Sequence, residues 1–149
     1  MAKVIDSSRV INGTWGEVWI NDDVVGGLVS MQAKIAFDKS DIKQCGAFMT
    51  GSKVTGGKGT GSIKVLKSDS KNILRMQNAT NGSVPNCTIM SNLADPDAFG
   101  SERIMLTGVS FDDVTLADYE AGTEGNVEMP FTFDNYELLD SIEGDDYDE

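Results

Sequence analysis

The chain of 149 residues carries 24 acidic and 12 basic side chains, a formal net charge of −12, and 40% of its residues are hydrophobic. Its length and apolar content predict one domain with an ordinary core, while the acidic excess argues against nucleic-acid binding by phosphate neutralisation. It contains no histidine, which excludes Ser-His-Asp and Cys-His nucleophiles and His-ligated zinc.

The first half of the chain begins with period-two patterns that are typical of strands. Residues 14–20 form the first predicted strand, and residues 21–23 form a turn. From Val29 to Phe37 the odd positions are apolar and the even positions are mostly polar. This alternation predicts a long strand with one packed face and one face in water.

The next segment, residues 38–62, breaks the pattern. It holds six glycines and four lysines and few apolar side chains, so the sequence predicts an irregular segment that becomes ordered on a partner. There its apolar side chains would find apolar partners and its lysines acidic ones. The residues expected at that contact are Ile42, Lys43, Phe48, Met49, Lys53, Val54 and Lys58, with Lys39 as a further lysine of the segment.

A short helix of about 12 residues is predicted after this segment. Ser68 or Asp69 is expected to cap it, and Asn81-Gly82 to end it. Its apolar stripe consists of Ile73, Leu74 and Met76.

The second half again predicts strands, over residues 86–93 and 127–134. Residues 103–117 are extended, but the apolar parity shifts, which fits one strand with a bulge near Gly108 or two strands joined by a turn. Pro130 lacks an N–H and indicates an edge position or a nitrogen directed away from the ladder; it joins the predicted subunit interface. The chain thus reads as one domain over residues 1–140, followed by an acidic, disordered segment, residues 141–149.

Charge is distributed unevenly along the chain. Residues 1–75 hold 11 of the 12 basic residues and 7 acidic ones, whereas residues 76–149 hold one basic and 17 acidic residues. This division fits either a solvated acidic tail or a subunit whose basic and acidic surfaces dock head to tail. No apolar run is long enough for a membrane span or a signal peptide, and Cys45 and Cys87 are predicted to be buried thiols.

Several motifs suggest chemistry but fit simpler structural roles. Residues 57–61 resemble a phosphate-binding loop, but the lysine is not followed by Ser or Thr and a helix; a flexible hairpin tip or assembly loop fits better. Adjacent aspartates such as Asp112-Asp113 point to opposite faces of a strand and are typical of turns. Trp15 and Trp19 could stack on a sugar, although packing is the commoner role. The sequence therefore predicts no catalytic residue, metal or cofactor.

Four blocks in this order resemble one protein family: residues 13–22, residues 49–61 with Met-Thr-Gly and Gly-Thr-Gly, residues 101–106, and residues 128–134 with Pro-Phe-Thr-Phe. They resemble the tail tube proteins of contractile phage tails, of the type found in Gram-positive prophages and phage-tail-like bacteriocins. The resemblance spans about residues 10–140. It implies an antiparallel β-sandwich or barrel-like domain with one short helix, whose copies form stacked hexameric rings with inner strands closing a tube.

This resemblance also implies partners and a location. The partners would be the chain itself, sheath, baseplate and tape-measure proteins, with DNA only passing through the channel; assembly would occur in the host cytoplasm. An acidic channel would repel that DNA. The polar faces of two predicted strands are expected to line the channel, namely Ser30, Gln32, Lys34, Glu128, Thr132 and Asp134. The alternatives are a secretion-system tube protein, a carbohydrate-binding β-sandwich and, least favoured, an enzyme using acidic residues.

Overall fold

The computed structural model describes residues 2–76, 82 and 86–143. Two 3-10 turns, η1 (Ser7–Arg9) and η2 (Gly13–Trp15), precede the sheets, and the described residues include one short helix, α1 (Lys71–Arg75). The strands are β1 (Gly16–Ile20), β2 (Asp23–Val24), β3 (Leu28–Ile42), β4 (Gly51–Leu66), β5 (Cys87–Leu93), β6 (Glu102–Phe111), β7 (Asn126–Phe133) and β8 (Asn135–Asp140). The predicted mainly antiparallel β class with one short helix is confirmed.

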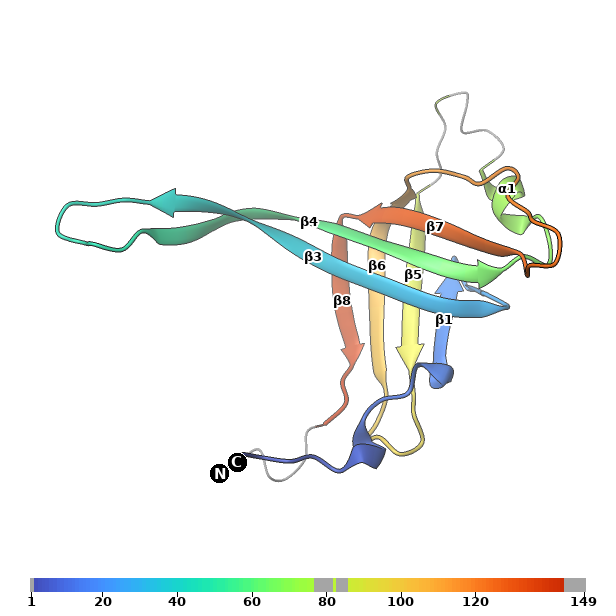
Figure 1. The fold of residues 1–149 in the computed structure, drawn as a ribbon, viewed down its shortest axis with the longest axis horizontal. Coiled ribbons are helices and arrows are strands. Elements are labelled where there is room, and N and C mark those ends of the chain that lie inside the picture. Colours follow the sequence, from blue (N-terminus) through green and yellow to red (C-terminus); the bar gives the residue numbers. More distant parts are fainter. Residues whose placement is uncertain (1, 77–81, 83–85, 144–149) are drawn as a thin grey trace.

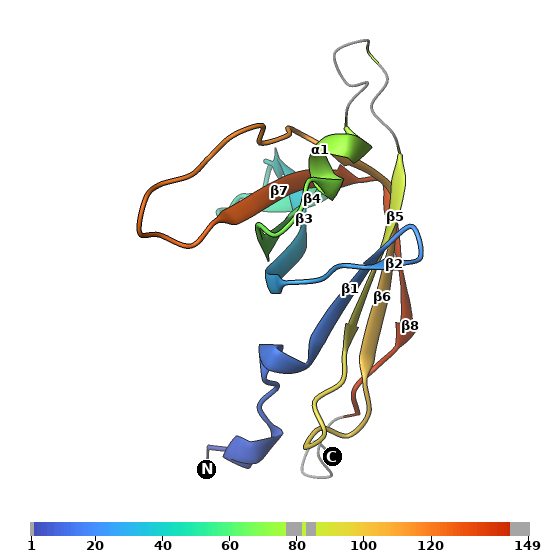
Figure 2. The same ribbon diagram turned by 90° about the vertical axis from the view of Figure 1, so that its right-hand side faces the viewer.

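Two antiparallel sheets cross steeply and share β6 (Figures 1 and 2). The first runs β2-β1-β5-β6-β8, and the second runs from the end of β6 through β7 and β4 to β3. Such orthogonal packing needs a strand that bends from one sheet into the other. The sheets do not close into a barrel within the described part of the chain, and β3 and β8 remain at open edges.

The bend in β6 lies at Gly108, as the parity shift predicted. Gly108 has φ of 65°, and the β5–β6 register slips by one residue around it. The bulge adds one residue to β6 between Leu106 and Val109. Both side chains therefore point toward the core, although they lie three positions apart, and both are buried. The strand ends at Phe111, so the extended stretch expected up to Ala117 was too long.

The chain then forms a connection that we call the acidic loop, residues 112–125. It begins where the Asp112 N–H donates to the Pro130 carbonyl (2.9 Å). The nitrogen and carbonyl of a strand residue point to the same side, so the missing N–H of Pro130 faces this loop and not the β4 ladder. The expected orientation of Pro130 is confirmed, although β7 lies between β4 and β6 and is not an edge strand.

The core fills the space between the two sheets. It is built mainly from alternate residues of five strands, as period-two patterning requires, together with Met76 directly after α1. At its centre the Phe131 ring is fully buried and packs edge to face against Phe111, with ring centroids 6.2 Å apart. The buried side chains are those of Val18, Ile20, Ile63, Val65, Met76, Cys87, Ile89, Leu106, Val109, Phe111, Val127, Met129, Phe131 and Phe133.

Residues 38–62 are not the irregular segment that composition suggested. They belong to a long antiparallel hairpin in which β3 pairs with β4 from Leu28 to Ile42. Its outer part, residues 36–58, projects beyond β7 and is exposed throughout; we call it the arm, with residues 43–50 as its tip (Figure 1). Backbone pairing in a hairpin satisfies the polar groups of the chain whatever the side chains are, so few apolar residues suffice.

Glycines in the inner part of β4 make room for aromatic rings. A Cβ atom on Gly59 would lie 2.5 Å from the Phe133 ring, and one on Gly61 would meet the Phe131 ring at 2.6 Å and the Gln32 carbonyl oxygen. Composition alone suggested that these glycines confer flexibility. They instead permit close packing, because bare backbone on one face of β4 leaves space for the aromatic residues of β7.

The packed face expected on residues 29–37 is only partly packed. Met31 and Ile35 pack against the core. Val29 is 51% exposed because it sits at a break in the register between Leu28 and Ser30, and Phe37 is 65% exposed because it lies on the arm. The alternation of apolar and polar positions was predicted correctly, but β3 extends beyond the part of the sheet that packs on the core.

Two smaller expectations need correction. The helix covers only Lys71–Arg75, and its N-cap residue is Ser70, which makes no side-chain capping hydrogen bond, rather than the expected Ser68 or Asp69. The Asp69 carboxylate accepts from the Lys71 backbone N–H (3.2 Å) just before the helix, and the proposed end at Asn81 lies outside the described residues. Cys87 is buried as predicted, but Cys45 is exposed at the arm tip.

The final segment, expected to be disordered from residue 141, is described only to residue 143. There the Glu143 N–H donates to the Phe99 carbonyl (3.1 Å), and residues 144–149 lie outside the described part.

Asp95 is a buried carboxylate that fastens the N-terminal segment to the end of β5. It is 7% exposed and accepts from the backbone N–H groups of Asn12 and Asp97, each at 2.9 Å. We expect Asp95→Ala to lower the free energy of unfolding by about 1–3 kcal/mol, because two donors lose a charged acceptor. Urea denaturation would measure this loss. Asp97→Ala is the matched control, since its side chain is exposed, and equal losses in both variants would contradict the role of Asp95.

Candidate assembly surfaces

The polar face of the β3-β4-β7 sheet brings the predicted channel residues together. The strands of Ser30 and Glu128 are not neighbours, because β4 lies between them. The registers nevertheless align these residues in three rows on one face: Ser30–Lys64–Glu128, Gln32–Ser62–Pro130 and Lys34–Thr60–Thr132. The face continues onto β6, where the Ser110 and Thr132 hydroxyls lie 3.2 Å apart.

Asp134 lies at the margin of this face. It follows β7, and its N–H donates to the Thr107 carbonyl (3.1 Å). Its carboxylate occupies the space that a side chain at Gly108 would need. Asp134 therefore sits over the bend in β6.

Sequence reasoning expected a strand through Ile63 and Val65 but named none of its residues as part of the polar face. Thr60, Ser62 and Lys64 alternate with Gly61, Ile63 and Val65, which is a period-two signal that the nearby glycines obscured. Lys64 stands between Ser30 and Glu128, and Lys34 lies two residues farther along β3 than Gln32. The face therefore carries mixed charge and is not the uniformly acidic surface that the net charge suggested.

Seven of the eight predicted interface residues lie on the arm. Phe48 and Met49 are at its tip, 104% and 81% exposed, and Ile42 and Val54 are 43% and 53% exposed. The predicted lysines Lys43, Lys53 and Lys58 are also exposed there. The eighth residue, Pro130, lies instead on the polar face of β7 between Ser62 and the acidic loop.

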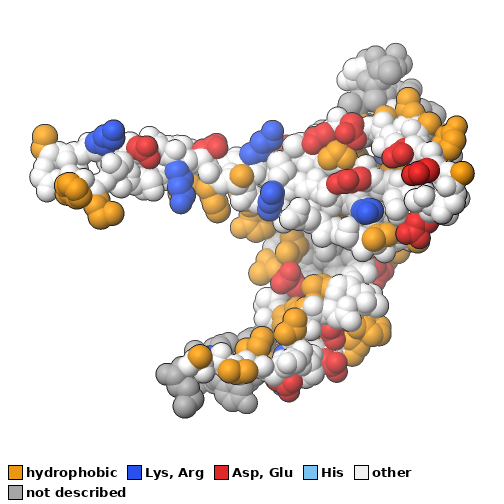
Figure 3. All heavy atoms as spheres, viewed as in Figure 1, with side chains coloured by type: hydrophobic (Ala, Val, Ile, Leu, Met, Phe, Trp, Pro, Cys, Tyr) orange, Lys and Arg blue, Asp and Glu red, His pale blue; other side chains and the backbone are white. Residues whose placement is uncertain are grey.

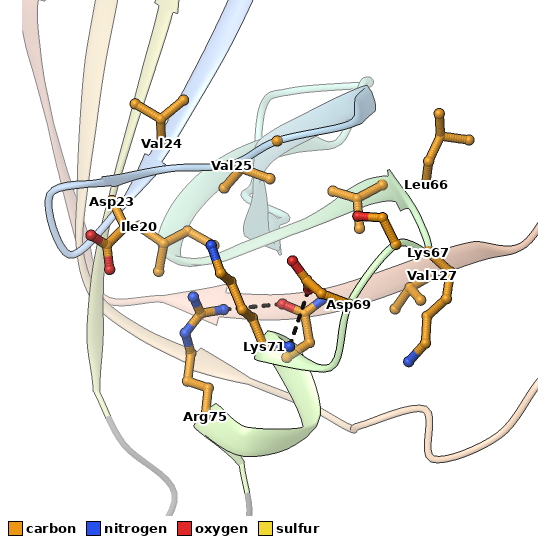
Figure 4. A pocket seen from close by; sticks show the side chains of 14 residues that line it. Ile20, Asp23, Val24, Val25, Leu66, Lys67, Asp69, Lys71, Arg75 and Val127 are labelled. Carbon is orange, nitrogen blue, oxygen red and sulfur yellow. Dashed lines mark hydrogen bonds between the residues drawn. The ribbon is translucent and has the colours of Figure 1, made fainter.

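A pocket of about 270 Å³ lies where α1 faces the β1–β2 turn. Lys71 and Arg75 extend from α1 toward that turn, and Asp23 and Asp69 line the same pocket (Figure 4). The Asp69 carboxylate accepts from the backbone N–H of Lys71, and the Arg75 guanidinium donates to the Asn72 side-chain oxygen (3.2 Å).

The structure contradicts two other chemical interpretations of the sequence. Residues 57–61 lie inside β4 and pair with β3 and β7, so they form neither a phosphate-binding loop nor a hairpin tip. Trp15 belongs to η2 and Trp19 to β1, so the flat strand face expected to hold both rings does not exist. Within residues 2–76, 82 and 86–143, no group of three or more Cys, Asp or Glu side chains could hold a metal ion. Nor does any helix of that part have the length and apolarity needed to cross a bilayer.

Comparison with known proteins gives concordant matches. A family model described as phage tail tube protein matches residues 3–140. The phage-like element PBSX protein XkdM of Bacillus subtilis (strain 168) is 29% identical over 141 residues, which covers 93% of this chain and 96% of that protein. YqbM of the same organism is 28% identical over 141 residues with the same coverage.

Solved structures share the fold. A chain in the PVC extracellular contractile injection system sheath-tube complex superposes with a TM-score of 0.67 at 11% identity, covering 91% of this chain and 99% of that one. A chain in the anti-feeding prophage tube-terminating cap gives 0.69 at 14% identity, covering 93% and 97%. A chain in the virion of a gene transfer agent gives 0.53 at 15% identity, covering 87% and 98%.

Proposed function

The chain belongs to the phage tail tube protein family, and we propose that its copies form stacked hexameric rings that make the inner tube of a contractile tail or tail-like particle. The observation that carries this proposal is the open hairpin. β3 pairs only with β4 among the described strands, and the arm is exposed along its whole length. An unpaired edge of this length invites pairing with another chain, and closure by identical neighbours removes the edge.

The polar face of the β3-β4-β7 sheet would line the channel. Ser30, Gln32 and Lys34 are exposed on it, together with Glu128, and the opposite face of the same sheet covers the core. A face of mixed charge with short hydroxyl side chains offers no stripe of cations that would hold passing DNA. The arm would lie against other copies, so that its exposed apolar side chains become buried.

A sheath, a baseplate and a tape-measure protein would be the partners of the assembled tube. This part of the proposal is supported by the fold shared with chains of a sheath-tube complex and of the anti-feeding prophage baseplate. The role is structural and requires no catalysis. Assembly would take place in the host cytoplasm, and the mature tube would belong to a virion tail or to a tail-like particle.

Electron microscopy of the concentrated protein tests this function. Negative staining is expected to show hollow rods or stacked rings of uniform diameter, with sixfold symmetry in end views. Dispersed monomers at every concentration, with or without a sheath protein, would contradict it.

Elongation of the tubes is expected to slow as ionic strength rises. Exposed charges that guide subunits together are screened within about 8–10 Å at physiological salt, and the arm and the acidic loop carry opposite charge. Light scattering would compare the elongation rates at about 50 mM and about 500 mM NaCl, which lie below and above physiological ionic strength. Equal rates would favour an interface governed by apolar contacts alone.

A further inference from the structure

We propose that the arm tip of one copy docks on the acidic loop of a second copy, with Phe48 inserted into the cavity beneath that loop. This inference rests on the proposed function and identifies the surface that receives the arm. Four observations carry it: exposed apolar side chains on both surfaces, a cavity that fits Phe48, opposite charge, and placement at opposite ends of one sheet.

Both surfaces expose large apolar side chains. Phe48 and Met49 at the tip are 104% and 81% exposed, and Leu116 and Tyr119 on the acidic loop are 70% and 89% exposed. Exposed apolar groups of this size gathered in one place mark an interaction site. Docking of the arm tip on the acidic loop would therefore bury the exposed apolar side chains of both surfaces.

The acidic loop also lines an open cavity of suitable size. The cavity measures about 170 Å³ and is lined by Leu116, Ala117, Tyr119 and Val127, with Lys67, Thr115, Asp118 and Gly125 around it. An apolar cavity of about 150 Å³ accommodates a benzene molecule. The ring of Phe48 has the size of benzene, so this cavity can receive it.

Charge complements the apolar fit. The arm carries four lysines and two aspartates, whereas the acidic loop carries five acidic residues and no basic one. Figure 3 shows blue side chains along the arm and red ones gathered over the opposite end of the body. Such an arrangement attracts a second copy in one orientation and repels the reversed one, because like surfaces would then meet.

The geometry prevents the contact from forming within one subunit. The paired part of the arm spans seven residues of β3, about 20 Å at strand spacing, and points away from the body. β4 runs from the arm to Leu66, which pairs with Asn126 directly after the acidic loop, so tip and loop lie at opposite ends of the same sheet (Figures 1 and 2). A contact between different surfaces of identical copies repeats head to tail and yields rings or filaments.

Disulfide trapping tests the contact directly, because the arm tip already holds the exposed Cys45. Tyr119→Cys places a thiol on the acidic loop of the next copy. After oxidation of concentrated protein with oxidised glutathione, non-reducing electrophoresis is expected to show a ladder of trimers and longer species, since a head-to-tail contact crosslinks repeatedly. Ser7→Cys, exposed in η1 away from both surfaces, is the control and should give no more than dimers. No ladder with Tyr119→Cys, or equal ladders in both variants, would overturn the proposal.

Charge exchange provides a second readout. An arm variant, Lys43→Glu with Lys53→Glu, and a loop variant, Asp118→Lys with Glu120→Lys, are each expected to lose tube formation. All four substitutions in one chain should restore it, because the attraction is reversed but preserved. If the wild type forms tubes and the fourfold variant does not, the docking surface is wrong while the tube function stands; if the wild type itself forms none, the proposed function fails.

Discussion

Phe48→Ser is expected to raise the critical concentration for tube assembly by about 10- to 100-fold while leaving the folded subunit unchanged. The side chain is fully exposed in the single chain, so its removal takes nothing from the core. In the tube it would be buried once per subunit. Burial of a phenylalanine contributes about 1.5–3 kcal/mol, and each 1.4 kcal/mol changes an equilibrium constant about tenfold.

Sedimentation of assembled from unassembled protein over a concentration series would give the two critical concentrations. Circular dichroism and urea denaturation of the subunit should be the same for both proteins. Val4→Ser is a matched control, since Val4 is 80% exposed but lies in the N-terminal segment. An unchanged critical concentration for Phe48→Ser would show that the arm tip is not buried on assembly.

Gly61→Ala is expected to lower the free energy of unfolding by about 2–3 kcal/mol, although it adds a single methyl group to a strand. That methyl would meet the Phe131 ring at 2.6 Å and the backbone oxygen of Gln32. The ring is fully buried and packed against Phe111 and Phe133, and the oxygen belongs to the paired strand, so neither can move away easily. A loss of this size is a large part of the roughly 5–15 kcal/mol typical of a domain.

Chemical denaturation of the unassembled subunit would measure this loss. Gly26→Ala is the control, because a Cβ atom there meets nothing within 4 Å and such surface changes stay within about 0.5 kcal/mol. Similar stabilities of the two variants would mean that β4 and β7 can separate enough to admit a side chain.

Local pattern in the sequence determined most of the strands. Alternation located β1, β5 and β7, and the parity shift near Gly108 located the bend in β6, because the two-residue period of a strand is a local property. The absence of histidine excluded the commonest nucleophile systems, because composition does not depend on how the chain folds. The uneven distribution of charge along the chain was also plain, but strands of the basic and acidic halves, β4 and β7, pair in one sheet.

Tertiary structure alone decided the meaning of the glycines and the arrangement of the surfaces. Residues 38–62 looked irregular because the sequence does not reveal that Phe131 and Phe133 lie over Gly61 and Gly59. Nor could it reveal that β4 separates β3 from β7 and completes the polar face, or that Cys45 is exposed while Cys87 is buried. These are pairings between residues far apart in the chain, and a local period carries no information on which strand lies beside which.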